Sequence, residues 1–274
     1  MTPVRALRSI PGMVGLGFTA VGVAAALFFL IGRGEAATGR GCKDLPNHDT
    51  LAQALSAARK EPNGGFNLEM WATVVNRDGV VCQVAFTGTD RGDQWPGSRV
   101  ISAQKANTAN AFSLPRLALS TGNLFSAVQP GSSLFGLQES NPVDTGVAYG
   151  GAPKRYGTKN DPMIGQRIGG INVFGGGLAL YAKDATLVGG LGVSGDSACA
   201  DHNIAWKTRH RLSLDKVPSG VNPVSKDDNI IYDTTKVDTA GGHTTSPSGF
   251  GHPACSTEAT TIGQQLPTTN PMAR

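Results

Sequence analysis

Several residue classes are scarce in this chain of 274 residues. Charged residues make up 16% of it and aromatic residues 6%. There is no run of three or more consecutive Lys and Arg residues beyond residue 35 and the net charge is only +4, so we expect no nucleic-acid partner. Glycine shows no three-residue period, and Glu, Lys and Leu are not abundant, which excludes collagen and a long coiled coil. Hydrophobic residues reach 39%, which argues against wholesale disorder.

Common enzymatic signatures are also missing. The chain has no G-x-x-x-x-G-K-[ST] loop, its glycine run at 190–195 does not match G-x-G-x-x-G, and no parallel βαβ repeat surrounds it. Ser194 does not stand in a G-x-S-x-G elbow, and no C-x-x-C pair suggests a zinc site. These absences favour a non-enzymatic protein but do not exclude an enzyme.

The longest apolar run lies at the amino terminus. Arg5 and Arg8 precede an uncharged stretch over 9–32, and Gly34-Glu35-Ala36 follows it. This order is typical of an export signal peptide, so we expect residues 1–36 to be removed after Ala36. Because the apolar core approaches the roughly 20 residues that span a bilayer, an uncleaved inner-membrane anchor at 12–32 is the alternative. Both interpretations predict a periplasmic or extracellular domain.

Four cysteines follow the predicted leader: Cys42, Cys82, Cys199 and Cys255. An even number in an exported chain indicates two disulfides. The residues alone allow three pairings, and buried free thiols are the alternative.

The pattern along residues 42–216 predicts an α+β domain. Three helices are expected. The first begins at His48, with Asp49 as its cap and an apolar stripe at 51, 54, 55 and 58. The second covers 99–112, and the third begins at 194–197 and ends at about 212. Hairpins are expected over 70–86 and 171–194. Glycines in the second indicate β-bulges or close approach of another backbone or a ligand. The order predicts an antiparallel sheet flanked by helices. Residues 113–168 form a long loop with one short helix at 124–128 and a functional surface, and 217–274 form an extended tail.

Five motifs within these segments form a recognisable set. They are Gly175-Gly176-Gly177-Leu178, the glycine-laced stretch 188–195, Asp201 with Ile204-Ala205, the first hairpin around Asp78-Gly79, and the helix containing Lys105 and Thr108. Together they resemble the GlcG/HbpS-like haem-binding family. The resemblance covers about residues 49–212. It implies a compact α+β domain, homo-oligomers and haem binding. The chain departs from the family at Cys199 and His202, where acidic residues are usual, and in the length of its loop and tail.

The resemblance therefore favours an exported haem (tetrapyrrole) binding protein that stores or senses haem. The alternative is a structural or accessory subunit of an exported complex, with partner contacts through the loop 141–168 and the tail 217–274. The added cysteines and the long tail favour this second interpretation.

Haem needs an axial ligand, and the histidines are the first candidates. They are His48, His202, His210, His243 and His252. His202, Trp206 and His210 are spaced by four and share a helix stripe, so we expect haem there with His202 as the metal ligand. The alternative is that the two histidines of this stripe, His202 and His210, lie on the surface of a solvated basic helix. That helix also carries Lys207, Arg209 and Arg211. Lys105 and Thr108 either face a ligand groove or make structural polar contacts.

The resemblance also implies how the cysteines pair. In the implied fold, Cys199 begins the last helix and Cys255 lies in the added tail, so the two departures from the family occur together. We therefore predict Cys199–Cys255, and Cys42–Cys82 as a local bridge between the start of the first helix and the first hairpin.

Overall fold

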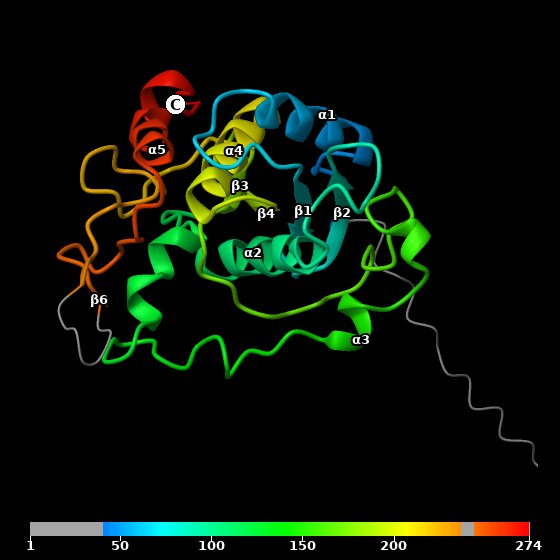
Figure 1. Cartoon of the computed structure of the whole chain (residues 1–274), viewed down its shortest axis with the longest axis horizontal. Coiled ribbons are helices and arrows are strands. Elements are labelled where there is room, and N and C mark those ends of the chain that lie inside the picture. The colour runs from blue at the N-terminus through cyan, green and yellow to red at the C-terminus, as the bar shows by residue number, and fades with distance from the viewer. Residues whose placement is uncertain (1–40, 237–243, 274) are drawn as a thin grey trace, which may run out of the picture. The chain divides into compact units, whose positions relative to one another are not determined.

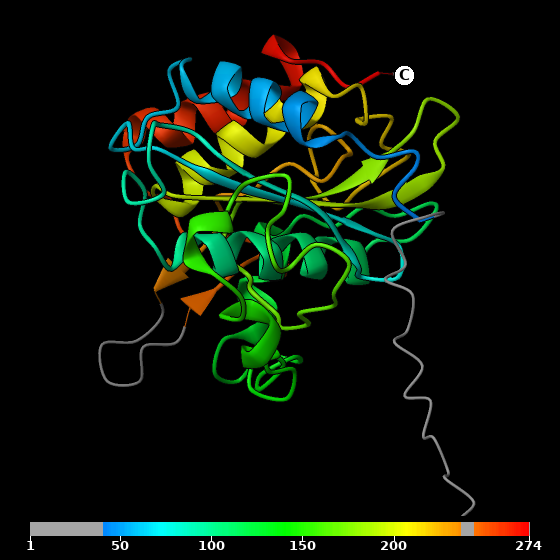
Figure 2. The same cartoon turned by 90° about the vertical axis from the view of Figure 1, so that its right-hand side faces the viewer.

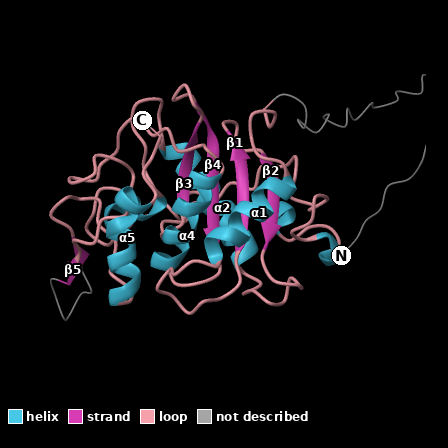
Figure 3. Cartoon of the chain, turned by 90° about the horizontal axis from the view of Figure 1, so that it is seen from above, coloured by secondary structure: helices cyan, strands magenta, loops and turns pink. Residues whose placement is uncertain are grey.

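The computed structural model describes residues 41–236 and 244–273. The predicted leader 1–36 and His243 lie outside the described residues. At the centre is a four-stranded antiparallel sheet in the order β2-β1-β4-β3 (Figures 1 and 3). The strands are β1 (Trp71–Asn76), β2 (Val81–Phe86), β3 (Gly177–Tyr181) and β4 (Leu187–Ser194). Both predicted hairpins are confirmed, and β1 joins them by pairing with β4.

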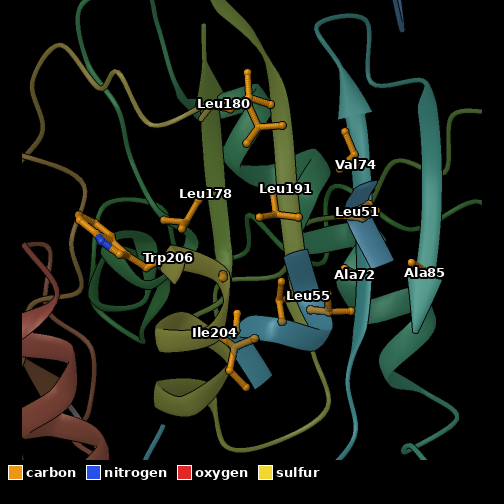
Figure 4. Packing of buried hydrophobic residues seen from close by; sticks show 14 of the residues in the cluster. Leu51, Leu55, Ala72, Val74, Ala85, Leu178, Leu180, Leu191, Ile204 and Trp206 are labelled. Carbon is orange, nitrogen blue, oxygen red and sulfur yellow. The ribbon is translucent and has the colours of Figure 1, made fainter. Parts of the chain in front are cut away.

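Helices cover both faces of the sheet, which confirms the predicted fold class. α1 (His48–Arg59) and α4 (Ala198–Arg211) lie on one face and α2 (Ser98–Phe112) on the other (Figure 2). Ala72 and Val74 of β1 belong to the core beneath α1 and α4 (Figure 4), whereas Trp71 and Val75 belong to the core beside α2. Since successive side chains of a strand point to opposite faces, a strand whose six residues are all buried needs both layers.

The cap of α1 differs from the prediction. Asn47, and not Asp49, caps this helix, and its side-chain oxygen accepts a hydrogen bond from the Thr50 N–H at 2.9 Å. Asp49 lies in the first turn, where a negative charge interacts favourably with the helix dipole. The predicted buried stripe of this helix is confirmed at Leu51, Ala54, Leu55 and Ala58.

The glycines of β4 allow α2 to lie directly against the strand. A Cβ atom at Gly192 would be 1.9 Å from the carbonyl oxygen of Ser102, and one at Gly190 would be 2.3 Å from that of Ala106. Any side chain at these two positions would push the helix away from the sheet. The glycine pattern that carries much of the family resemblance therefore serves helix–sheet packing at these positions.

The loop 113–168 has little regular structure, but it is held to the α2 side of the sheet. In place of one short helix at 124–128, it contains 3-10 turns at Thr121–Leu124 and Ser126–Val128. Helix α3 (Thr145–Ala148) and a 3-10 turn at Pro153–Arg155 follow. Ala148, Met163 and Ile168 then join the core beside α2.

The tail contains a helix that the sequence analysis did not predict. After the short strands β5 (Thr235–Lys236) and β6 (Thr244–Thr245), α5 runs over Thr257–Thr269. It lies beside α4, where Asn203 Nδ2 donates to the carbonyl oxygen of Ala259 at 3.0 Å (Figure 1). Its buried residues, Ala259, Gly263 and Leu266, recur at helical spacing. Within 41–236 and 244–273, none of the helices combines the length and apolar character that crossing a membrane requires.

Both predicted disulfides are present. Cys42 joins Cys82 with a Cα–Cα distance of 5.7 Å, and Cys199 joins Cys255 with a distance of 6.0 Å. The first ties the segment before α1 to β2. The second ties the first turn of α4 to the tail just before α5, so the tail is covalently attached to the domain close to its last helix.

Candidate functional site

The predicted iron ligand, His202, is fully buried in α4 beneath the tail. Its Nε2 atom lies 3.2 Å from Asn229 Oδ1 and 3.3 Å from the backbone nitrogen of Ile230. Its Nδ1 atom is enclosed by protein and has no hydrogen-bond partner among the described residues. One ring nitrogen is thus engaged by the tail and the other is shielded from solvent, so iron could reach His202 only if the tail moved.

The surroundings of His202 also fix its charge. Burial lowers its pKa to about 3, with the nearby positive charge of Arg209 acting in the same direction, while Asp228 and the hydrogen bond to Asn229 oppose the shift. The imidazole is therefore neutral at neutral pH. This state suits an internal hydrogen-bonding group as well as it suits a metal ligand.

The other two members of the predicted stripe contact separate parts of the chain. The Trp206 ring lies 6.3 Å from that of His202, and its Nε1–H donates to the carbonyl oxygen of Asn270 at 3.0 Å. His210 Nδ1 lies 2.8 Å from Asp215 Oδ2 near the end of α4. The stripe exists on the helix, but the structure does not gather its side chains around a common space.

The prediction of a solvated basic face on α4 is wrong for two of its three members. Arg209 is buried, and its guanidinium donates to both carboxylate oxygens of Asp228, at 2.6 and 2.8 Å. Lys207 is also buried, donates to the carbonyl oxygen of Pro62 at 2.7 Å, and lies 3.3 Å from Glu61. Helix periodicity could not show this, because the acidic partner of Arg209 comes from the tail.

Lys105 and Thr108 are buried and engaged within the protein. Lys105 Nζ lies 2.7 Å from Asp201 Oδ2 and donates to the carbonyl oxygen of Val193 at 3.1 Å. The Thr108 hydroxyl donates to the carbonyl oxygen of Gln104 at 2.7 Å and accepts from the backbone N–H of Asn172 at 3.0 Å. Burial raises the pKa of Asp201 to about 6 and lowers the pKa of Lys105. These contacts match the structural alternative for both residues.

The remaining described histidines are also engaged. His252 is buried, which lowers its pKa to about 4, and its Nδ1 lies 2.7 Å from the carbonyl oxygen of Pro253. His48 Nε2 lies 2.9 Å from the carbonyl oxygen of Gly157. Neither ring presents both nitrogens to solvent.

A cleft of about 370 Å³ opens at the N-terminal end of α2. Its size lies within the range of small-molecule sites, and its exposed wall is mostly apolar, as such sites usually are. It brings together β1, the loop before α2, the first turn of α2 and part of the loop 141–168. The lining residues are Trp71, Asp90, Arg91, Gly92, Pro96, Gly97, Arg99, Val100, Tyr149, Pro153 and Tyr156.

One wall of this cleft is held in place by a buried ion pair. The Arg99 guanidinium lies 3.7 Å from the centre of the Tyr156 ring, and its Nε–H donates to Asp161 Oδ2 at 2.9 Å. Asp161 also accepts backbone N–H bonds from Gly157 and Met163, at 2.7 and 2.9 Å. The loop from which Tyr156 projects is thus fixed to α2, and the charge of Arg99 is already balanced.

The second arginine of the cleft is different. The side chain of Arg91 is 46% exposed, and its Nη1 lies 3.9 Å from the Asp90 carboxylate, too far for a hydrogen bond. A cation in this setting can pair with a carboxylate of a bound molecule. The cleft therefore combines apolar and aromatic walls with one available positive charge.

The sequence analysis expected a functional surface in 113–168 but did not identify the cleft. Tyr149 and Tyr156 lie in that segment, whereas Trp71 and Arg99 lie in a strand and a helix. The available signal was the pair of tyrosines seven residues apart in a stretch rich in glycine and proline.

Three solved structures are similar to part of this chain. The PduOC–haem complex is 23% identical, with 60% of this chain and 90% of that chain covered and a TM-score of 0.42. Protein ORFY of Klebsiella pneumoniae is 26% identical over 60% of this chain and 88% of its own, with a TM-score of 0.40. HbpS is 17% identical over 59% and 83%, with a TM-score of 0.35. No curated protein matches the chain.

The family comparison is more specific. The model of the family described as "Haem degrading protein HbpS-like" matches residues 47–209. This range begins at the cap of α1, ends in the last turn of α4, and includes all four strands of the central sheet. The match spans more than half of the sequence, and this chain therefore belongs to the HbpS-like family.

Proposed function

We propose that the chain is an exported haem-binding protein that stores or senses haem, and that haem binds in the cleft at the N-terminal end of α2. Membership of the HbpS-like family supports haem as the ligand. The observation that carries the proposal is the mostly apolar, aromatic-walled cleft, because haem needs an apolar slot and an axial ligand.

The residues of the cleft fit this ligand. Trp71, Val100 and Tyr156 supply apolar and aromatic contact, Tyr149 supplies a phenol oxygen, and Arg91 can pair with a propionate. Bound haem would supply an iron centre whose reactivity depends on its axial ligand and on the polarity around it. The predicted site around His202 fits less well, since its residues are already engaged with one another and with the tail.

The proposal of export rests on two features. Residues 1–36 have the order of a signal peptide or anchor. The two disulfides would persist in an oxidising compartment such as the periplasm or the extracellular space. Amino-terminal sequencing of the exported protein tests this, with a start at Ala37 expected after cleavage and an intact Met1 in the membrane expected for an anchor. Assembly into homo-oligomers belongs to the same proposal and is tested by measuring the mass in solution.

Haem titration monitored by the Soret band tests both that haem is the ligand and that it binds in this cleft. Gly97 lines the cleft, has an ordinary φ of −64°, and has no atom within 4 Å of an added Cβ. The variant Gly97→Trp should therefore fill the cleft and abolish saturable binding, while Gly97→Ala should bind like the wild type. Binding that survives in Gly97→Trp would place haem elsewhere, and no saturable binding by the wild type would refute the function.

The contribution of Arg91 has its own control. Losing one charged contact of about 1 kcal/mol should weaken haem binding about fivefold in Arg91→Gln. Haem dimethyl ester, which lacks free carboxylates, should bind both proteins equally. Arg116→Gln removes the same charge at an exposed position outside the cleft and should change neither affinity. A Soret band that decays when reductant is added would indicate turnover of haem and not storage.

A further inference from the structure

The cleft lacks the iron ligands that the sequence analysis expected. None of the four described histidines lines it, and its described lining contains no cysteine or methionine. The lining side chains with polar atoms are Trp71, Asp90, Arg91, Arg99, Tyr149 and Tyr156. The indole and guanidinium groups are donors without a lone pair for iron, which leaves one carboxylate and two phenols.

Two of these three groups are engaged. The Asp90 carboxylate accepts a hydrogen bond from the backbone N–H of Gly92 at 2.8 Å. The Tyr156 hydroxyl hydrogen is shared between the carbonyl oxygens of Tyr149 and Gly150, at 3.0 and 3.1 Å, and its ring face is covered by Arg99. If either group bound iron, it would lose contacts that shape the cleft.

Tyr149 differs from Asp90 and Tyr156, because only its backbone is engaged and its side chain is not. Its backbone is fixed, because its N–H donates to the carbonyl oxygen of Thr145 at 3.1 Å and its own carbonyl oxygen accepts from Tyr156. The residue is 64% exposed, and its hydroxyl forms no hydrogen bond with any residue of 41–236 or 244–273. A fixed backbone with an unengaged phenol on the cleft wall is a suitable position for a ligand atom.

We propose that Tyr149 is the axial ligand of ferric haem in this cleft, an inference that rests on the proposed function. The phenol oxygen binds Fe(III) as a phenolate, and its proton passes to solvent water. Tyrosine is an established axial ligand of haem iron in proteins. The assignment replaces the sequence-based choice of His202, whose ring is covered by the tail.

The experiment compares two variants that each remove one hydroxyl. Ferric haem is added to the wild type, Tyr149→Phe and Tyr232→Phe, and each complex is examined by optical absorption and resonance Raman spectroscopy. Tyr232 lies outside the lining of the cleft, and its buried hydroxyl has no hydrogen-bond partner among the described residues. The wild type and Tyr232→Phe should show the phenolate-to-iron charge-transfer band and the phenolate vibrations. Tyr149→Phe should lose both signals and bind haem at least about tenfold more weakly, whereas Tyr149→His should give an imidazole-type spectrum.

The outcomes separate this inference from the proposed function. A Tyr149→Phe complex whose spectrum equals that of the wild type would overturn the assignment of Tyr149 and leave haem binding intact. A wild-type imidazole spectrum that disappears in His202→Ala would do the same. A wild-type protein that binds no haem would overturn the proposed function itself. Since Tyr149 is largely exposed, its substitution should leave the circular dichroism spectrum unchanged.

Discussion

Acidification should destabilise this protein through two buried histidines. Burial lowers the pKa of His202 to about 3 and that of His252 to about 4, from an ordinary value of 6.5. The unfolded chain therefore takes up a proton on each ring at a higher pH than the folded chain does. The stability that depends on the neutral rings is fully present above about pH 6.5 and is lost as the pH falls from there toward 4 and 3.

The size of the effect follows from the same values. At pH 5 both rings are protonated in the unfolded state and neutral in the folded state, which costs about 2 kcal/mol for each histidine relative to pH 7.5. Together they should lower the free energy of unfolding by about 4 kcal/mol. This is a large fraction of the roughly 5–15 kcal/mol that stabilises a typical domain.

Urea unfolding at pH 7.5 and pH 5.0 measures this loss with the disulfides intact. His202→Gln and His252→Gln should each reduce the difference between the two pH values by about 2 kcal/mol, and the double variant should remove both contributions. The comparison uses the change with pH within each protein, so any general destabilisation by glutamine cancels. If the double variant loses as much stability on acidification as the wild type, burial of these rings does not control the pH dependence.

Two further predictions concern packing and cross-linking. Gly192→Ala should lower the free energy of unfolding by about 3 kcal/mol, because its Cβ would lie 1.9 Å from the Ser102 carbonyl oxygen. Gly97→Ala, whose Cβ would lie in open space, should change the free energy of unfolding by less than about 0.5 kcal/mol. Equal losses for the two variants in urea unfolding would contradict the packing role of Gly192. Replacing both Cys199 and Cys255 by serine should cost up to about 4 kcal/mol, from the loop entropy of a 56-residue separation. Peptide mapping under non-reducing conditions should first identify this bridge, and a loss below about 1 kcal/mol would show that the bridge adds little to the contacts that already hold the tail.

The elements of the domain were predictable because each has a local signal. The apolar stripe of α1 at Leu51, Ala54, Leu55 and Ala58 has helical spacing, and a turn containing Asp78-Gly79 connects β1 and β2. Helix α5 has a weaker signal, because its buried face at helical spacing consists only of Ala259, Gly263 and Leu266. It contains five threonines, a glycine and a proline, all weak helix formers. Packing on α4 favours this helix where propensity does not.

The candidate site was less accessible to sequence reasoning for a different reason. His202 stands on a helix whose sequence resembles a half-exposed helix, with basic residues on several sides. Whether such a helix is exposed depends on Asn229, Ile230 and Asp228, which come from the tail and are close to it only in the folded chain. The cleft likewise joins β1, α2 and the distant Tyr149, a juxtaposition that periodicity within any one segment does not contain.

The covered helix α4 has a consequence for the order in which the chain can fold. Eleven of its fourteen residues are buried, and the carboxylate that neutralises Arg209 lies nineteen residues later, in the tail. While the tail is still being synthesised, α4 would hold a guanidinium without its partner and an uncovered imidazole, so docking it on the sheet would be costly. Many domains fold as soon as their own residues leave the ribosome. Because Asp228 and Asn229 belong to the tail, this domain should complete its fold only after the tail has emerged at least as far as these two residues.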